Sequence, residues 1–136
     1  MSKRGFNILL GISALVFGSL IYILFRENTY IAKCFESFDI VIRMRQILLP
    51  YKSCFLIFYF GDFLWALSLG CGLYAIFVPR IYGTVICTCV VLCLGCVWEV
   101  LQYCSIISGT GDILDMLAYL LASSIIIIIN AKERET

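Results

Sequence analysis

The residues of this sequence best suited to chemistry are acids placed within or beside long apolar runs. Four of its nine acidic residues are so placed: Asp62, Glu99, Asp112 and Asp115. Glu99 and Gln102 are three residues apart and would share one helix face. Asp112, Asp115 and Tyr119 have the i, i+3, i+7 spacing that gives a second such face. Grouped carboxylates suit the binding of a cationic or hydroxylated group, or of a hard divalent cation such as Mg²⁺.

Three of these acids also have a purely structural interpretation. Asp112 follows a Gly-Thr-Gly turn and suits the cap of a helix, and Asp115 would then occupy the first turn, where the helix dipole favours an acid. Asp62 is an interfacial residue if its apolar segment begins at Phe60. Both interpretations stay open for each of the three.

Glu99 is explained least by capping or exposure. It lies about 25 Å along a helix that starts near Tyr82, at about 1.5 Å per residue. Charges near the bilayer centre cost about 2.5–3.5 kcal/mol on insertion scales, and such residues usually face a protein interior or a watery cavity. We therefore expect a functional or pairing role for Glu99.

Arg45 is the cation that could pair with one of these acids. On a helical wheel it falls among apolar residues, near Val41 and Leu48, rather than on the polar face of its segment. It would either pair with a clustered carboxylate or extend along the membrane interface. The sequence leaves these alternatives open.

The elements that position these residues are predicted to be transmembrane helices. Of 136 residues, 62% are hydrophobic and 14% are charged, with a mean hydropathy of +1.03. A span needs roughly 20 apolar residues, so the chain has room for about four. The prediction is a single all-α membrane domain, residues 1–136, with spans at about 6–25, 55–78, 82–107 and 112–129. The first run is too long for the apolar core of a cleaved signal peptide.

An interfacial amphipathic helix is predicted at about residues 31–49, between the first two spans. Its polar face would carry Glu36, Asp39, Arg43 and Gln46, and Pro50 would end it. Tight turns are expected at Pro79-Arg80 and at residues 108–111. Because spans joined by short turns are antiparallel, the four acids should meet at one leaflet, beside this amphipathic segment.

Charge and cysteine content exclude several classes of protein. The net charge of +1 gives no basic excess for nucleic acid. Cys87, Cys89, Cys93 and Cys96 lie in one apolar run, where thiols act as small hydrophobes, and no disulfide is expected among them. Cys93 and Cys96 form a C-x-x-C, but the chain has no histidine and no second such motif, which argues against zinc. Lys and Arg divide five against five between the two sides, so the positive-inside rule does not decide orientation.

The acidic motifs resemble those of the VanZ-like family of small bacterial membrane proteins. Glu99 and Gln102 match its E-x-x-Q, and Gly109, Asp112 and Asp115 match its G-x-x-D-x-x-D. Asp62, in Gly61-Asp62-Phe63-Leu64-Trp65, resembles the upstream aspartate of the family, so the resemblance covers about residues 47–130. The histidine that many relatives carry after that aspartate is missing, and Tyr119 stands where an asparagine is common. The resemblance implies a multi-pass protein of the bacterial cell membrane and a link to teicoplanin resistance, but it supplies no reaction.

Three functions compete at this point. The first is a binding or resistance protein whose acidic pocket recognises a polar group on a membrane lipid or an amphiphilic envelope-active compound. The second is a metal-dependent intramembrane enzyme acting on a lipid phosphate or diphosphate, with the cation held by Glu99, Asp112 and Asp115; no other cofactor is expected. The third is a structural subunit. The expected binding residues are Asp62, Glu99, Gln102, Asp112, Asp115, Arg45 and Tyr119.

Overall fold

The computed structural model describes residues 2–27, 29–51, 55–77, 83–107 and 112–130. Its long helices are α1 (Lys3–Phe25), α4 (Phe55–Phe77), α5 (Gly83–Tyr103) and α6 (Ile113–Asn130). Three short elements follow α1, namely α2 (Tyr30–Cys34), α3 (Asp39–Leu48) and the 3-10 turn η1 (Leu49–Tyr51). Within these described ranges, four helices are long and apolar enough to cross a membrane, so this is an all-α, multi-pass membrane protein, as predicted.

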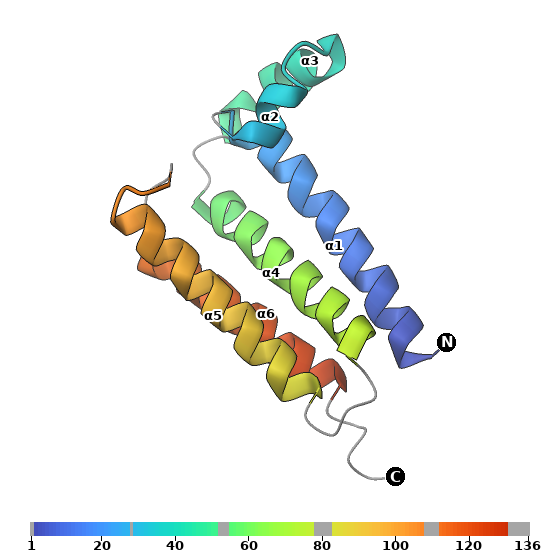
Figure 1. Ribbon diagram of the computed structural model, residues 1–136. Helices are drawn as coiled ribbons and strands as arrows, with labels where there is room; N and C mark the ends of the chain where they lie inside the picture. The colour runs from blue at the N-terminus through green and yellow to red at the C-terminus, as the bar shows by residue number, and fades with distance from the viewer. Residues whose placement is uncertain (1, 28, 52–54, 78–82, 108–111, 131–136) are drawn as a thin grey trace.

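Helix α4 is the centre of the bundle. It packs against α1 on one side and against α5 and α6 on the other (Figure 1). Small residues at Gly11, Ala14 and Gly18 form the face that α1 turns to α4. A Cβ added at Gly11 would lie 3.1 Å from the Cβ of Cys71, which indicates how closely the two backbones approach. Close packing through small residues is the usual mode of association for helices in lipid.

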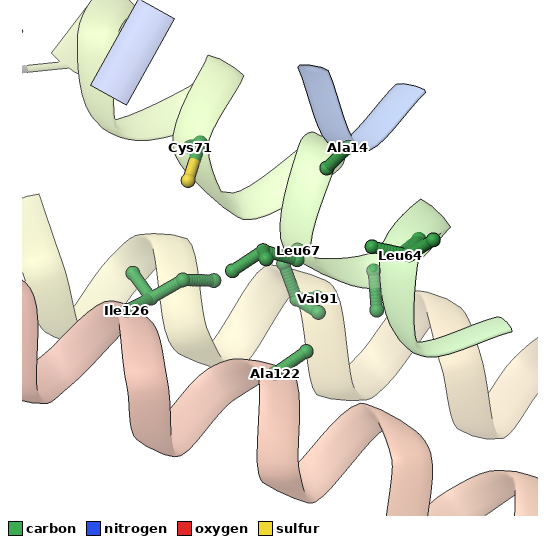
Figure 2. Close-up of a cluster of buried hydrophobic side chains, with 8 residues drawn as sticks. Ala14, Leu64, Leu67, Cys71, Val91, Ala122 and Ile126 are labelled. Atoms are coloured by element: carbon green, nitrogen blue, oxygen red, sulfur yellow. The ribbon is translucent and has the colours of Figure 1, made fainter. Parts of the chain in front are cut away.

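The apolar core lies where α4 meets the other three long helices. Figure 2 shows side chains from all four converging there. Its buried members are Ala14, Leu64, Ala66, Leu67, Cys71, Val91, Ala122 and Ile126. This core fixes the register of the helices and therefore the positions of the polar side chains nearer their ends.

The third span is shorter than predicted. Helix α5 ends at Tyr103 instead of continuing to about residue 107. Ser105 adopts a left-handed conformation with φ of 57°, and the N–H of Ile106 donates to the carbonyl of Leu101 at 2.9 Å. Ser105 N–H donates to the carbonyl of Gln102, also at 2.9 Å. These bonds form a Schellman motif, here built on serine instead of the usual glycine.

The predicted amphipathic helix is two helices. Cys34 ends α2 and Asp39 begins α3, with a turn between them, and α3 ends at Leu48 directly before the 3-10 turn that contains Pro50. Thr29 caps α2 by accepting the N–H of Ala32 at 3.3 Å. Val41 is the buried residue of α3, which packs against α1. The turns predicted at Pro79-Arg80 and at residues 108–111 lie outside the described residues.

The cysteines of α5 form no disulfide. Cys87, Cys89, Cys93 and Cys96 are free thiols, which confirms the prediction. Their surroundings differ from the expected buried helix, because only Cys87 is buried and the other three face outward, toward lipid. There they act as small apolar surface residues of the span.

Two asparagines join the start of α1 to the end of α6, at the end of the bundle away from α2 and α3. The amide nitrogen of Asn7 donates to Oδ1 of Asn130 at 2.9 Å, and both residues are buried. Each amide also donates to a carbonyl of its own helix, Asn7 to Lys3 at 2.9 Å and Asn130 to Ile126 at 2.8 Å. Buried side-chain hydrogen bonds of this kind hold helices together where no hydrophobic effect acts between them.

Candidate acidic site at one end of the bundle

The four acids meet at the end of the bundle where α1 and α5 finish and α4 and α6 begin. This is the end that carries α2 and α3 (Figure 1). The relative exposure is 7% for Asp62, 4% for Glu99 and 9% for Asp115. The prediction that these three side chains point inward is confirmed, and all three lie toward the same end of the bundle. We call Asp62, Glu99, Asp112 and Asp115 the acidic cluster.

Asp62 is held by two residues: Tyr22 of α1 and Arg26, the C-cap residue of that helix. The hydroxyl of Tyr22 donates to Asp62 Oδ1, and Nη2 of Arg26 forms an ion pair with Oδ2 at 2.7 Å. Tyr22 and Arg26 are four residues apart and share a helix face, and the guanidinium lies 4.7 Å from the centroid of the Tyr22 ring. Burial alone would lower the pKa of Arg26, but the Asp62 carboxylate and Tyr22 outweigh it and raise that pKa above its ordinary value. Arg26 is therefore a permanent cation.

Glu99 uses both carboxylate oxygens to join α5 to α6. The hydroxyl of Tyr119 donates to Oε1 at 2.9 Å, and the backbone N–H of Asp112 donates to Oε2 at 3.0 Å. Gly95, one turn before Glu99, provides the space for the Tyr119 ring, because a Cβ there would lie 2.4 Å from Cδ2 of that ring. The tyrosine thus reaches Glu99 only because residue 95 has no side chain.

Asp112 caps α6, which confirms its structural interpretation. Its Oδ1 accepts the N–H of Leu114 at 3.0 Å, and its Oδ2 accepts the hydroxyl of Tyr59 at 2.7 Å. These two bonds, the one from Leu114 first, lower the pKa of Asp112 below its ordinary value. Asp112 is half-buried and lies at the rim of the acidic cluster.

Asp115 lies in the first turn of α6 and turns toward α4. Its carboxyl is within hydrogen-bonding reach of the Asp62 carboxyl, and it also experiences the charges of Glu99 and Arg26. Three buried carboxyl groups thus gather in one electrostatic network, and Arg26 is the cation that the described residues bring into it.

Arg45 lies away from the acidic cluster and bonds to backbone carbonyls. The predicted alternative, an ion pair between Arg45 and one of the clustered acids, is therefore wrong. Its Nε and Nη2 donate to the carbonyl of Ile23 at 3.0 and 2.8 Å, and Nη2 also reaches the carbonyl of Ala32 at 3.3 Å. These bonds satisfy a carbonyl in the last turn of α1, where a cation also complements the helix dipole. Gln102 is half-buried at the end of α5, and no bond from its side chain to another described residue is found.

Sequence reasoning missed three residues of the site: Tyr22, Arg26 and Tyr59. Arg26 directly follows the first predicted span, which ends at about residue 25. The antiparallel topology that gathered the acids also places the end of the first span at the same leaflet, and the i, i+4 spacing puts Tyr22 beside Arg26. That signal was present in the sequence. Tyr59 had no such signal, because its contact depends on the register between α4 and α6.

No group of three or more acidic, cysteine or histidine side chains suited to holding a metal ion occurs among the described residues. A comparison of the chain with protein-family models, with curated proteins and with solved structures found no match. The geometry of the site therefore carries the functional proposal.

Proposed function

We propose that this chain is a membrane binding protein whose acidic cluster recognises a cationic group, such as an ammonium, on a lipid or an envelope-active amphiphile. The observation that supports this most is the surplus of negative charge. Asp62, Glu99 and Asp115 are all buried, and among the described residues one cation, Arg26, reaches them, in an ion pair with Asp62. A purely structural network at a membrane helix end would be expected to balance its charges, because unpaired buried charges are costly.

The position of the cluster suits an amphiphile. It lies near the ends of the long helices, at the depth where a lipid head group meets the hydrocarbon. Asp112 and Tyr59 form its half-buried rim, and Gln102 adds an amide beside them at the end of α5. An entering ammonium would meet the rim first and would then be attracted by the buried carboxylates.

The test is a thermal-shift titration of the purified protein in an uncharged polyoxyethylene detergent. Decylammonium is the cationic probe, decyl maltoside the hydroxylated one, and Mg²⁺ alone tests the metal alternative. Binding to the folded state at ten times Kd stabilises it by about 1.4 kcal/mol, which raises Tm by several degrees. We expect a saturable rise with decylammonium only. Equal shifts with decylammonium and the maltoside, or a shift with Mg²⁺ alone, would overturn the proposal.

The resemblance to VanZ-like proteins extends the proposal to the bacterial cell envelope and to glycopeptide resistance. The resemblance alone supports this extension. The test is expression of the chain in a teicoplanin-susceptible bacterium, with the empty vector as the control. We expect the chain to raise the inhibitory concentration of teicoplanin. An unchanged inhibitory concentration would contradict this extension, whereas the binding proposal itself is tested by the titration.

A further inference from the structure

An apolar groove runs along the outer seam between α1 and α4. Its volume is about 320 Å³, and its walls include Phe17, Leu20 and Ile21 of α1 and Phe60 and Leu64 of α4. Phe17, Leu20 and Phe60 are 61%, 45% and 52% exposed, so the groove opens outward. In a membrane that opening faces lipid.

A second hollow adjoins the groove and is polar at its far side. Leu24 and Phe25 line both, and the second hollow, of about 210 Å³, is also lined by Glu27 and by Arg45 and Gln46 of α3. Because α3 lies at the end of α1, the two hollows together extend from the hydrocarbon region toward the membrane interface (Figure 1). The apolar groove therefore adjoins a hollow whose polar side chains are a guanidinium, an amide and a carboxylate.

The guanidinium of Arg45 is held in a fixed position. Its Nε and Nη2 donate to the carbonyls of Ile23 and Ala32, while its Nη1 donates to no atom of the described residues. A guanidinium with a donor to spare is well suited to a phosphate oxygen, and one already fixed loses little freedom on binding.

The length of the groove fits one leaflet. From Phe17 to Phe25 the helix rises about 12 Å, against about 15 Å for half of the hydrocarbon core. We propose that the groove binds one acyl chain of a phospholipid whose phosphate accepts hydrogen bonds from Arg45. This site is independent of the proposed function, because Tyr22 and Arg26 point to the acidic cluster from the other face of α1.

The experiment is native mass spectrometry of the protein after exchange into mixed micelles of an uncharged detergent with palmitoyl-oleoyl phosphatidylglycerol. Palmitoyl-oleoyl glycerol, which has the same chains without phosphate, is the comparison lipid. We expect one phosphatidylglycerol to stay bound under conditions that remove the diacylglycerol. Equal retention of the two lipids would overturn the role of the phosphate.

Leu20→Trp fills the groove, and Val16→Trp, on an exposed part of α1 outside the groove wall, is its matched control. We expect Leu20→Trp to reduce retention of phosphatidylglycerol about tenfold, which corresponds to 1.4 kcal/mol, and Val16→Trp to leave it unchanged. Equal retention by the two variants, both folded by circular dichroism, would overturn the groove. The decylammonium shift should be the same in both, so a failure here is separable from a failure at the acidic cluster.

Arg45→Gln tests the phosphate contact, with Arg43→Gln on the same helix as its control, since Arg43 does not line the hollow. Arg45→Gln should lower retention of phosphatidylglycerol toward that of the diacylglycerol, and Arg43→Gln should not. Because Arg45 also caps α1, circular dichroism of each variant serves as the check on folding. Full retention by a folded Arg45→Gln protein would overturn the phosphate contact.

Discussion

The Glu99 carboxylate accepts the backbone N–H of Asp112, the residue that caps α6, at 3.0 Å. A helix with its own capping box satisfies this N–H with an acid or amide at the third helical position. In α6 that position is Asp115, whose carboxyl turns to Asp62 instead. Glu99 thus completes the start of α6 from the neighbouring helix, and Asp115 is left available to the acidic cluster.

The cap at Asp112 predicts a specific response to acid. The pKa of Asp112 in the folded protein lies below its ordinary value of about 3.9 because of its bonds from Leu114 and Tyr59. Its stabilising contribution is therefore present above about pH 4 and is lost as the pH falls through the lower folded-state pKa. Asp112→Asn keeps the cap without the titration. Between pH 6 and pH 3 the Tm of the wild type should fall further than that of this variant, and parallel curves would contradict the assignment.

The ion pair between Arg26 and Asp62 predicts strong coupling. Arg26→Gln leaves the Asp62 carboxylate buried without its cation and should destabilise the protein by about 2–3 kcal/mol. That is less than the roughly 3–5 kcal/mol of a fully buried pair, because the Arg26 side chain keeps 25% of its exposure. The double variant Arg26→Gln/Asp62→Asn should recover part of the loss in SDS-induced unfolding. Strictly additive effects would mean that the pair does not contribute.

The contact of Tyr119 with Gly95 predicts the effect of a single methyl group. Gly95→Ala places a Cβ 2.4 Å from the Tyr119 ring, so the ring must move away from Glu99. We expect a loss of about 1–3 kcal/mol, typical of overpacking. Gly72→Ala is the control, because a Cβ there meets nothing within 4 Å and should be neutral or stabilising by up to about 1 kcal/mol. If both variants unfold alike, the ring does not occupy this position.

The asparagine pair predicts coupling between the start of α1 and the end of α6. Removal of either Asn7 or Asn130 removes both hydrogen bonds between them, at 2.9 and 3.4 Å, and leaves the other amide buried. A double-mutant cycle with alanine should give a coupling energy of about 0.5–1.7 kcal/mol, the range found for hydrogen bonds between membrane helices. The measurement is unfolding in mixed micelles, and a coupling of zero would mean that the pair does not join α1 to α6.

Much of this fold could be predicted from the sequence, because hydropathy and length fix the spans and short turns make neighbours antiparallel. The same reasoning placed Asp62, Glu99 and Asp115 at one leaflet. Helix ends were less predictable, since the Schellman motif that stops α5 depends on a left-handed serine, for which the sequence carries no strong signal.

The partners of the acids could be predicted only in part. On a helical wheel Arg45 lies on the face that is expected to point inward. The group that it contacts depends on the turn between α2 and α3, because this turn places Arg45 within reach of the carbonyl of Ile23. The position of Arg26 beside the acidic cluster could be predicted, because the antiparallel topology of the spans is enough to place it there. The contact of Tyr119 with Glu99 was not predictable in the same way, because it depends on the absence of a side chain at Gly95 on the facing helix.

The proposal that the buried carboxylates bind a cationic group is tested most directly by the decylammonium titration of Glu99→Gln. This variant keeps the side-chain volume and one acceptor for Tyr119 or Asp112, so it should fold, with a loss of about 1–3 kcal/mol. Arg45→Gln should not restore that loss, because Arg45 bonds to Ile23 and Ala32 instead of Glu99.

The matched control is Glu36→Gln, which removes an exposed acid from the turn between α2 and α3 at the same end of the molecule. The saturable rise in Tm with decylammonium should persist in Glu36→Gln and should disappear, or need about tenfold more probe, in Glu99→Gln. An unchanged titration in a folded Glu99→Gln protein would contradict the proposed function.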